Sequence, residues 1–171
     1  MTNTNENAAR LTILRGLPGS GKSRFTAPLE AQGAVVASAD RFPGLYEGEF
    51  NPADLDPAHG LSVRTAIEGL QAGRHVVVDN TNLSAEEMVP YVALAQAFRV
   101  DCEIVTVSCD PETAFARNTH GVPRAVFFGT EERPGGMVGR FEAFEAPFHW
   151  QFLPWLSQRG VGERWQASQT A

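Results

Sequence analysis

The chain has 171 residues, of which 43% are hydrophobic and 20% are charged, and its formal net charge is −6 at pH 7. This length favours one domain with a full hydrophobic core. The acidic balance argues against broad non-specific binding to nucleic acid or to an anionic membrane, while leaving room for a local basic cleft.

The sequence carries no signal for membrane insertion or export. No apolar run approaches the roughly 20 residues of a membrane span, so we expect no membrane partner. The N-terminus is polar and lacks the core of a signal peptide, and we expect a disordered tail over residues 1–9. Cys102 and Cys109 lie too far apart on one predicted strand to form a disulfide. Reduced thiols of this kind are typical of a cytoplasmic protein, which is the localisation we expect.

The first predicted strand, residues 11–14, leads into the octapeptide Gly16-Leu17-Pro18-Gly19-Ser20-Gly21-Lys22-Ser23. Its spacing matches G-x-x-x-x-G-K-[ST], in which backbone N–H groups and the start of the next helix surround a phosphate. We expect that helix over residues 22–30, shortened by Pro28. The motif predicts ATP and Mg²⁺ as cofactors, with Lys22 on the β- and γ-phosphates and Ser23 on the metal. The residues expected to bind ATP here are Gly16, Pro18, Gly19, Ser20, Gly21, Lys22 and Ser23.

Two further strands are predicted before the middle of the chain. Residues 34–40 form a buried strand that ends at Asp40, and a loop follows over 41–56. A helix over 56–72, stopped by Gly73, leads to the strand 75–80. Strands that alternate with helices favour a three-layer α/β/α fold of the P-loop NTPase class, with a mostly parallel sheet and a helical lid.

In such sheets, ligands bind at the carboxyl ends of the strands, which brings Asp40 and Asp79 beside the phosphate loop. Asp40 is a candidate base that accepts the proton of a substrate hydroxyl, and capping of a turn is the alternative. Asp79 is a candidate Mg²⁺ ligand through water, again with capping as the alternative. Asn80 and Asn82 are candidates either for substrate binding or for organising the turn.

The second half of the chain continues the alternation and then loses it. A helix over 84–98 begins with a Ser84–Glu87 capping box, and a strand over 103–109 and a helix over 111–117 follow. Residues 118–139 have weak patterning and carry several basic side chains, which predicts a mobile lid with at least one catalytic arginine. A short helix is expected over 138–145. The aromatic segment 147–156 is predicted to be an additional strand or a packing segment, which would end the domain 10–156. Residues 157–171 are expected to be a flexible tail.

These motifs, together with Arg117-Asn118-Thr119-His120-Gly121-Val122-Pro123, occur in an order that resembles the polynucleotide-kinase-like branch of the phosphate-loop kinases. The resemblance implies that Lys22 and Ser23 bind ATP and Mg²⁺, that Asp40 activates the acceptor hydroxyl, and that 117–123 lies in the lid. In this light Arg117 is expected to be catalytic, Arg124 to contact ATP, and Arg41 to contact the acceptor. The sequence departs from the family where Phe42-Pro43-Gly44 replaces a second basic residue and where 128–136 looks inserted.

The resemblance favours an ATP-dependent kinase that acts on a nucleic-acid 5′-hydroxyl. The acidic net charge favours the alternative of a kinase for a small molecule such as a nucleoside, a sugar acid or an antibiotic. A third hypothesis is a non-catalytic module that changes shape when it binds ATP. The salt dependence of the acceptor KM separates the first two hypotheses, because binding to a polyanion releases counterions.

Overall fold

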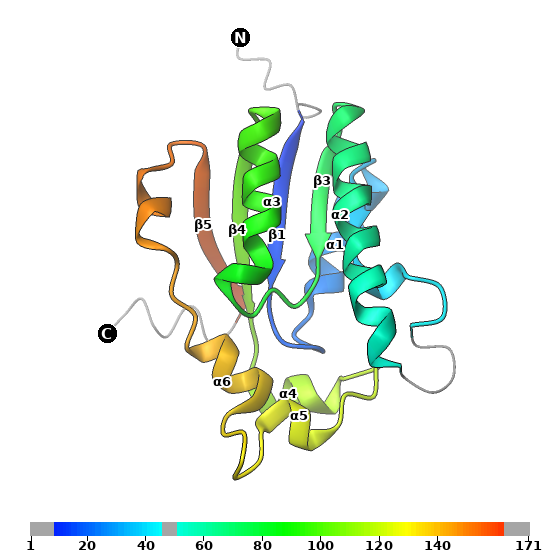
Figure 1. Ribbon diagram of the computed structural model, residues 1–171, viewed down its shortest axis with the longest axis vertical. Helices are drawn as coiled ribbons and strands as arrows, with labels where there is room; N and C mark the ends of the chain where they lie inside the picture. The colour runs from blue at the N-terminus through cyan, green and yellow to red at the C-terminus, as the bar shows by residue number, and fades with distance from the viewer. Residues whose placement is uncertain (1–8, 46–50, 163–171) are drawn as a thin grey trace.

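The computed structural model describes residues 9–45 and 51–162, and it contains a parallel sheet of five strands within those ranges. The strands are β1 (Arg10–Arg15), β2 (Val35–Ala37), β3 (His75–Asp79), β4 (Asp101–Ser108) and β5 (Leu156–Gly162), in the spatial order β2-β3-β1-β4-β5. All neighbouring strands of this sheet pair in parallel, as the alternating pattern predicts. The phosphate loop therefore leaves the middle strand, with the ends of β3 and β2 beside it (Figure 1).

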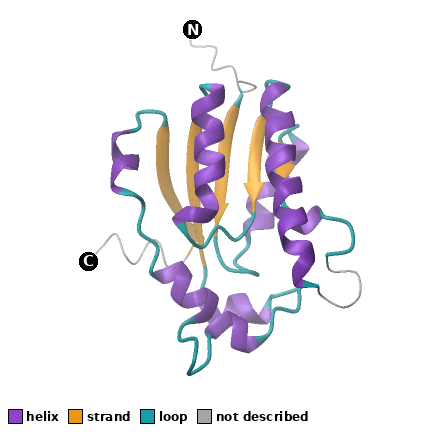
Figure 2. Ribbon diagram, viewed as in Figure 1, coloured by secondary structure: helices purple, strands orange, loops and turns teal. Residues whose placement is uncertain are grey.

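Three longer helices cover the two faces of the sheet. Helices α2 (Leu55–Gln71) and α3 (Ala85–Phe98) lie on one face, and α1 (Lys22–Ala31) lies on the other (Figure 2). The first face packs around Leu11, Ile13 and Val78, while Phe25 and Leu29 of α1 pack against the second face. The strands read as continuous apolar runs because both of their faces are covered. The predicted three-layer fold is confirmed.

Three short helices lie below the carboxyl edge of the sheet in Figure 1: α4 (Pro111–Ala116), α5 (Arg124–Phe128) and α6 (Gly136–Glu142). They share a small apolar cluster in which Phe127, Leu17 and Leu83 are almost completely buried. The hairpin that joins α5 to α6 is closed by a hydrogen bond from the backbone N–H of Thr130 to the carbonyl oxygen of Arg133 and by a β-bridge between Gly129 and Pro134. The segment predicted to be the lid, 118–139, thus contributes α5 and the start of α6 to a helical unit that packs against Leu17 of the phosphate loop.

The C-terminal end corrects the sequence prediction. Residues from 157 were expected to be a flexible tail, but β5 pairs with β4 along its whole length and extends the folded part of the chain to Gly162. Its sequence has few β-branched residues and it lies at the sheet edge, so the signal for a strand is weak. The aromatic segment before it is the 3₁₀ helix η3 (Phe148–Phe152), whose Trp150 is buried. The packing alternative for this segment is therefore correct.

Several boundaries also differ from the prediction. Asp40 lies on the 3₁₀ helix η1 (Ala39–Arg41) rather than on β2, and η2 (Pro52–Asp54) interrupts the predicted loop over 41–56. The side chain of Ser84 makes no capping hydrogen bond, and Glu87 accepts from the backbone N–H of Leu83. The predicted Ser84–Glu87 capping box is therefore wrong. Helix α6 begins two residues before the predicted start, and β4 ends before Cys109.

Within the described ranges no helix is both long and apolar enough to cross a bilayer. The predictions for residues 1–8 of the N-terminal tail, for 46–50 of the loop and for 163–171 of the C-terminal tail fall outside the described residues.

Candidate functional site

The phosphate loop joins the end of β1 to the start of α1, and its glycines are required by geometry. Gly19 and Gly21 have φ values of +77° and +103°, which side chains disfavour. A Cβ at Gly19 would overlap the carbonyl of Ala114, and a Cβ at Gly16 would lie 2.7 Å from the carbonyl oxygen of Val107. The loop therefore lies tightly against α4 and the end of β4 in a conformation that only glycine permits.

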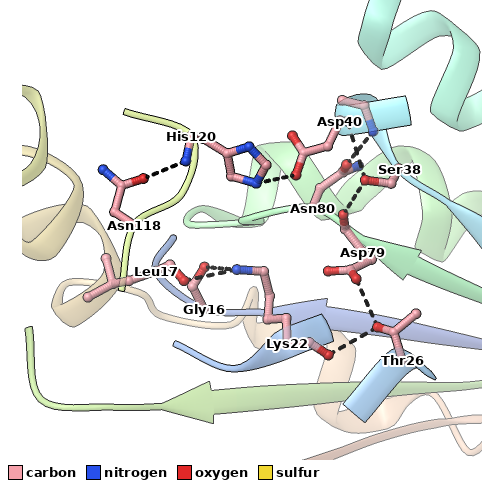
Figure 3. Close-up of polar contacts among 11 residues, drawn as sticks. Gly16, Leu17, Lys22, Thr26, Ser38, Asp40, Asp79, Asn80, Asn118 and His120 are labelled. Atoms are coloured by element: carbon pink, nitrogen blue, oxygen red, sulfur yellow. Dashed lines mark hydrogen bonds and ion pairs between the residues drawn. The ribbon is translucent and has the colours of Figure 1, made fainter. Parts of the chain in front are cut away.

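Lys22 points back into this loop (Figure 3). Its Nζ donates hydrogen bonds of 2.9 Å to the carbonyl oxygens of both Gly16 and Leu17. Burial lowers the pKa of Lys22, and the nearby carboxylates of Asp79 and Asp40 act in the opposite direction. A desolvated ammonium held at the centre of a glycine loop is suited to bind a phosphate, whose charge would restore the usual pKa.

The loop also holds a polar group without a partner, which tests whether a phosphate fits. The hydroxyl of Ser20 is buried and has no hydrogen-bond partner among the described residues. A bound phosphate oxygen would satisfy this hydroxyl, because phosphates accept several hydrogen bonds. Together with Lys22 and the αL glycines, this orphaned group shows that the residues present fit the phosphates of a nucleotide.

Ser23 and Asp79 are the predicted Mg²⁺ ligands, and the structure places them on neighbouring elements. Ser23 is exposed in the first turn of α1, and Thr26, one turn further, donates a 2.8 Å hydrogen bond to Oδ2 of Asp79. No group of three or more His, Cys, Asp or Glu side chains gathers in the described residues. One hydroxyl and one carboxylate fit Mg²⁺, which uses few protein ligands and completes its shell with phosphate and water.

Burial raises the pKa of Asp79, and Asp40 raises it further. The hydrogen bond from Thr26 and the positive charge of Lys22 oppose this shift. A divalent cation would favour the ionised carboxylate, so the electrostatics of Asp79 suit a metal ligand.

Asp40 is held at the end of β2 by hydrogen bonds that come from the end of β3. The hydroxyl of Ser38 donates to the carbonyl oxygen of Asp79 at 2.8 Å and accepts from the backbone N–H of Asp40 at 3.3 Å. The side-chain oxygen of Asn80 accepts from the backbone N–H of Ala39 at 2.8 Å. The two strand ends are thereby fixed to each other, with the carboxylate of Asp40 exposed to solvent.

The structure does not support the predicted contact of Asn80 and Asn82 with substrate. Asn80 is 8% exposed, and its NH₂ group donates to Ser62 and Tyr91, at 3.1 and 3.2 Å. Asn82 is 2% exposed and donates to the carbonyl oxygen of Leu14 at 2.6 Å. These amides are used inside the protein, which corresponds to the alternative that they organise the turn.

The lid reaches Asp40 through a histidine. Nε2 of His120 lies 3.4 Å from Oδ2 of Asp40, and the imidazole points toward the carboxylate (Figure 3). The backbone N–H of His120 donates to the side-chain oxygen of Asn118, whose NH₂ group donates to the carbonyl oxygen of Val122. This turn presents the imidazole on the side of the site that faces η1.

The three predicted arginines lie around the site without meeting in one place. Arg117 follows α4, and its backbone packs against Gly19 of the phosphate loop. Arg124 forms two hydrogen bonds with Glu112 and stacks over the ring of Phe128. Arg41 forms a 2.8 Å ion pair with Glu30 at the end of α1. Arg117 thus adjoins the phosphate loop. Arg124 and Arg41 are instead paired with Glu112 and Glu30, outside the loop.

Sequence reasoning missed Arg15, the residue just before the phosphate loop. Its guanidinium is almost fully buried, donates to the carbonyl oxygen of Phe141 and lies 4.2 Å from the ring centres of both Phe141 and Phe144. Burial lowers its pKa to about 10. Arg15 therefore ties the phosphate loop to the end of α6 and the turn after it. An arginine that ends an otherwise apolar strand is the one sequence signal for this role.

Comparison with known proteins agrees with this geometry. A family model described as an AAA domain matches residues 11–126. NEDD4-binding protein 2 from Homo sapiens is 34% identical over 124 residues, which cover 67% of this chain and 7% of that protein. The chain thus spans only a small part of the length of this curated relative.

Two solved structures show the same fold at low sequence identity. A chain of the Pnkp1/Rnl/Hen1 RNA repair complex has a TM-score of 0.61 and 20% identity, over 82% of this chain and 46% of that chain. Kti12 from Chaetomium thermophilum, in complex with ADP-AlF3, has a TM-score of 0.54 and 18% identity, over 94% of both chains.

Proposed function

We propose that this chain, which belongs to the AAA domain family and is a P-loop nucleotide-binding domain of the polynucleotide-kinase-like type, transfers the γ-phosphate of ATP to a substrate hydroxyl. The observation that carries the proposal is the arrangement of three adjacent strand ends. They bring together the ammonium of Lys22, the carboxylate of Asp79 and the carboxylate of Asp40. A phosphate binder, a metal ligand and a base are the three parts that phosphoryl transfer needs.

Each side chain takes one role in this proposal. Lys22 exchanges its bonds to the carbonyls of the loop for bonds to phosphate oxygens, while Ser23 and Asp79 hold Mg²⁺, which neutralises phosphate charge when bound. Asp40 accepts the proton of the acceptor hydroxyl. At the same time the hydroxyl oxygen bonds to the γ-phosphorus, and the bond from the γ-phosphorus to the leaving oxygen of ADP breaks. Arg117, beside the loop, is the candidate for stabilising the charge of the transition state.

The remaining predicted residues take supporting roles. The glycines and Ser20 of the phosphate loop bind ATP through their backbone N–H groups and hydroxyl. Arg124 requires release from Glu112 before it contacts ATP, and Arg41 requires release from Glu30 before it contacts the acceptor. Asn80 and Asn82 hold the strand ends in place rather than contacting the acceptor.

We take a nucleic-acid 5′-hydroxyl as the preferred acceptor class. The family and the likeness to a chain of an RNA repair complex support this choice. A small-molecule hydroxyl is the alternative, favoured by the net charge of −6. A steep rise of the acceptor KM with salt supports the nucleic acid, since each phosphate contact releases counterions.

The experiment that tests catalysis compares wild-type protein with Asp40→Asn, using γ-labelled ATP and Mg²⁺. We expect label transfer to fall by at least about a hundredfold, as for loss of a general base. Calorimetric affinity for ATP should stay within about threefold, because Asp40 does not form the phosphate loop. Asp101→Asn is the matched control, because Asp101 begins β4 at the amino ends of the strands, away from the phosphate loop. Full transfer by Asp40→Asn would overturn the assigned role of Asp40.

A further inference from the structure

On the acceptor side of the site, a side chain from an unexpected element, the lid, contacts the carboxylate of Asp40. Arg41 is the neighbour of Asp40 in the chain, but its guanidinium is paired with Glu30 of α1. A contact to the carboxylate of Asp40 comes instead from Nε2 of His120, which lies 80 positions further along the chain on the lid. The sequence after Asp40 continues as Phe42-Pro43-Gly44, which offers no second basic side chain.

His120 is held in this position by its own turn. Asn118 accepts from the backbone of His120 at 3.2 Å and donates to the carbonyl oxygen of Val122 at 3.0 Å. Val122 packs into the apolar cluster of the lid, and Gly121 takes a φ of +67° that completes the turn. The backbone that carries the imidazole is therefore fixed by the fold of the lid.

Both side chains of this contact remain accessible to a solute. The side chain of His120 is 36% exposed and that of Asp40 is 44% exposed. An acceptor hydroxyl that reaches Asp40 must therefore approach beside the imidazole. An imidazole N–H is a good donor to a phosphate oxygen, and such a charge-assisted bond is stronger than one to a neutral oxygen.

On this geometry, and resting on the proposed function, we propose that His120 is the specificity-determining residue of the acceptor side. In this structure Nε2 of His120 faces the carboxylate of Asp40. When the acceptor carries a phosphate near its reactive hydroxyl, a phosphate oxygen takes over the N–H of His120. Asp40 is then released to accept the hydroxyl proton. An acceptor without that phosphate leaves the carboxylate paired and reacts more slowly.

The experiment measures kcat/KM for two acceptors that differ only in the phosphate, thymidine 3′-monophosphate and thymidine. In the wild-type protein we expect the monophosphate to be preferred. In His120→Ala we expect this preference to fall by about tenfold or more, the effect of one charge-assisted hydrogen bond. His120→Lys keeps a hydrogen-bond donor at this position and should keep most of the preference. His149→Ala, on the exposed helix η3, is the matched control.

A second readout does not depend on turnover. The imidazole resonances of His120 in nuclear magnetic resonance spectra should shift in Asp40→Asn protein, whereas those of His149 should not. An unchanged His120 resonance would overturn the contact. Equal losses on both acceptors in His120→Ala, or an unchanged preference, would overturn the specificity role while leaving the proposed kinase function intact. Absence of transfer by the wild-type protein to any hydroxyl would instead show that the proposed function itself is wrong.

Discussion

The side-chain oxygen of Asn80 accepts a hydrogen bond of 2.8 Å from the backbone N–H of Ala39, the residue directly before Asp40. Asn80 in turn donates to the hydroxyls of Ser62 on α2 and Tyr91 on α3, which are bonded to each other at 2.8 Å. This buried network joins both helices of one layer to the end of β3. It therefore sets the position of the candidate base relative to the phosphate loop.

Replacing Asn80 with alanine should destabilise the protein and misplace Asp40. The change leaves the N–H of Ala39 without its buried partner and removes a donor from the hydroxyls of Ser62 and Tyr91, which keep their bond to each other. We expect unfolding to become easier by about 2–3 kcal/mol. Urea unfolding measures this loss. Asn51→Ala, which removes an exposed capping bond at η2, is the control and should cost about 1 kcal/mol or less. Equal losses in the two variants would contradict the structural role of the network.

Lys22→Met should abolish the stabilisation of the protein by ATP without lowering its stability in the absence of ATP. The ammonium is desolvated, as the lowered pKa of Lys22 indicates, so its removal costs little stability. At an ATP concentration of 100 times Kd, wild-type protein should gain about 2.7 kcal/mol, while the variant should gain almost none. Thermal unfolding with and without ATP measures both quantities. Arg24→Met, on the exposed side of α1, should behave as wild type. An ATP-induced rise in Tm that persists in Lys22→Met would show that this lysine is not the phosphate ligand.

The response of the site to Mg²⁺ should depend on pH through Asp79. The pKa of Asp79 is raised by burial, so protonation competes with the metal at a higher pH than for an ordinary aspartate. Without metal, the raised pKa of Asp79 makes protonated Asp79 stabilise the folded state at pH values below 3.8, its pKa in the unfolded chain. This contribution to the free energy of unfolding is lost as the pH rises through the pKa of Asp79 in the folded protein. We expect the Mg²⁺-dependent part of ATP affinity to weaken on acidification and to be absent in Asp79→Asn. Calorimetric titrations at several pH values test this, with Asp56→Asn as control, and a Mg²⁺ effect that survives in Asp79→Asn would contradict it.

His75 should make the fold sensitive to acid at the opposite end of the sheet. Its Nε2 lies 2.9 Å from Oγ1 of Thr12, and burial, followed by the charge of Arg10, lowers the pKa of His75 to about 4 from 6.5. Because the folded pKa is the lower one, the unfolded chain takes up the proton first as the pH falls from 6.5 to 4, and stability is lost in that window. We expect the free energy of unfolding to fall by roughly 1–2 kcal/mol, because solvent reaches the partly buried ring and weakens the effect of its pKa shift. Urea unfolding at pH 7 and 4.5 should show this loss in wild-type protein and a smaller one in His75→Gln, with the exposed His59→Gln as control. An equal loss in wild-type protein and His75→Gln would contradict the assignment.

The phosphate loop and its neighbouring strand ends were predictable because each depends on local spacing. Gly16 to Ser23 follow a fixed pattern, and Asp40 and Asp79 each follow an apolar run. The sheet rule then brings these ends together without knowledge of any side-chain contact. The alternation of strands and helices was enough to predict the layers.

What the sequence did not reveal depends on pairings between distant residues. The pairing of β5 with β4 decides its conformation, because Gly160 and Gly162 give little strand propensity of their own. The burial of Arg15 depends on Phe141 and Phe144, which lie more than 120 positions away. The inward use of Asn80 depends on hydroxyls that the helices α2 and α3 supply, and no periodicity in the sequence marks these partners.

The measurement that tests the central claim most directly is transfer of label from γ-labelled ATP, with Mg²⁺, to 5′-hydroxyl DNA and RNA oligonucleotides, beside a panel of nucleosides and sugars. We predict label on the 5′ end of an oligonucleotide in wild-type protein and its loss in Asp40→Asn. Label on a small molecule alone would move the protein to the metabolite kinases. Confirmed ATP binding with no transfer to any acceptor would contradict the kinase function and favour a nucleotide-binding switch.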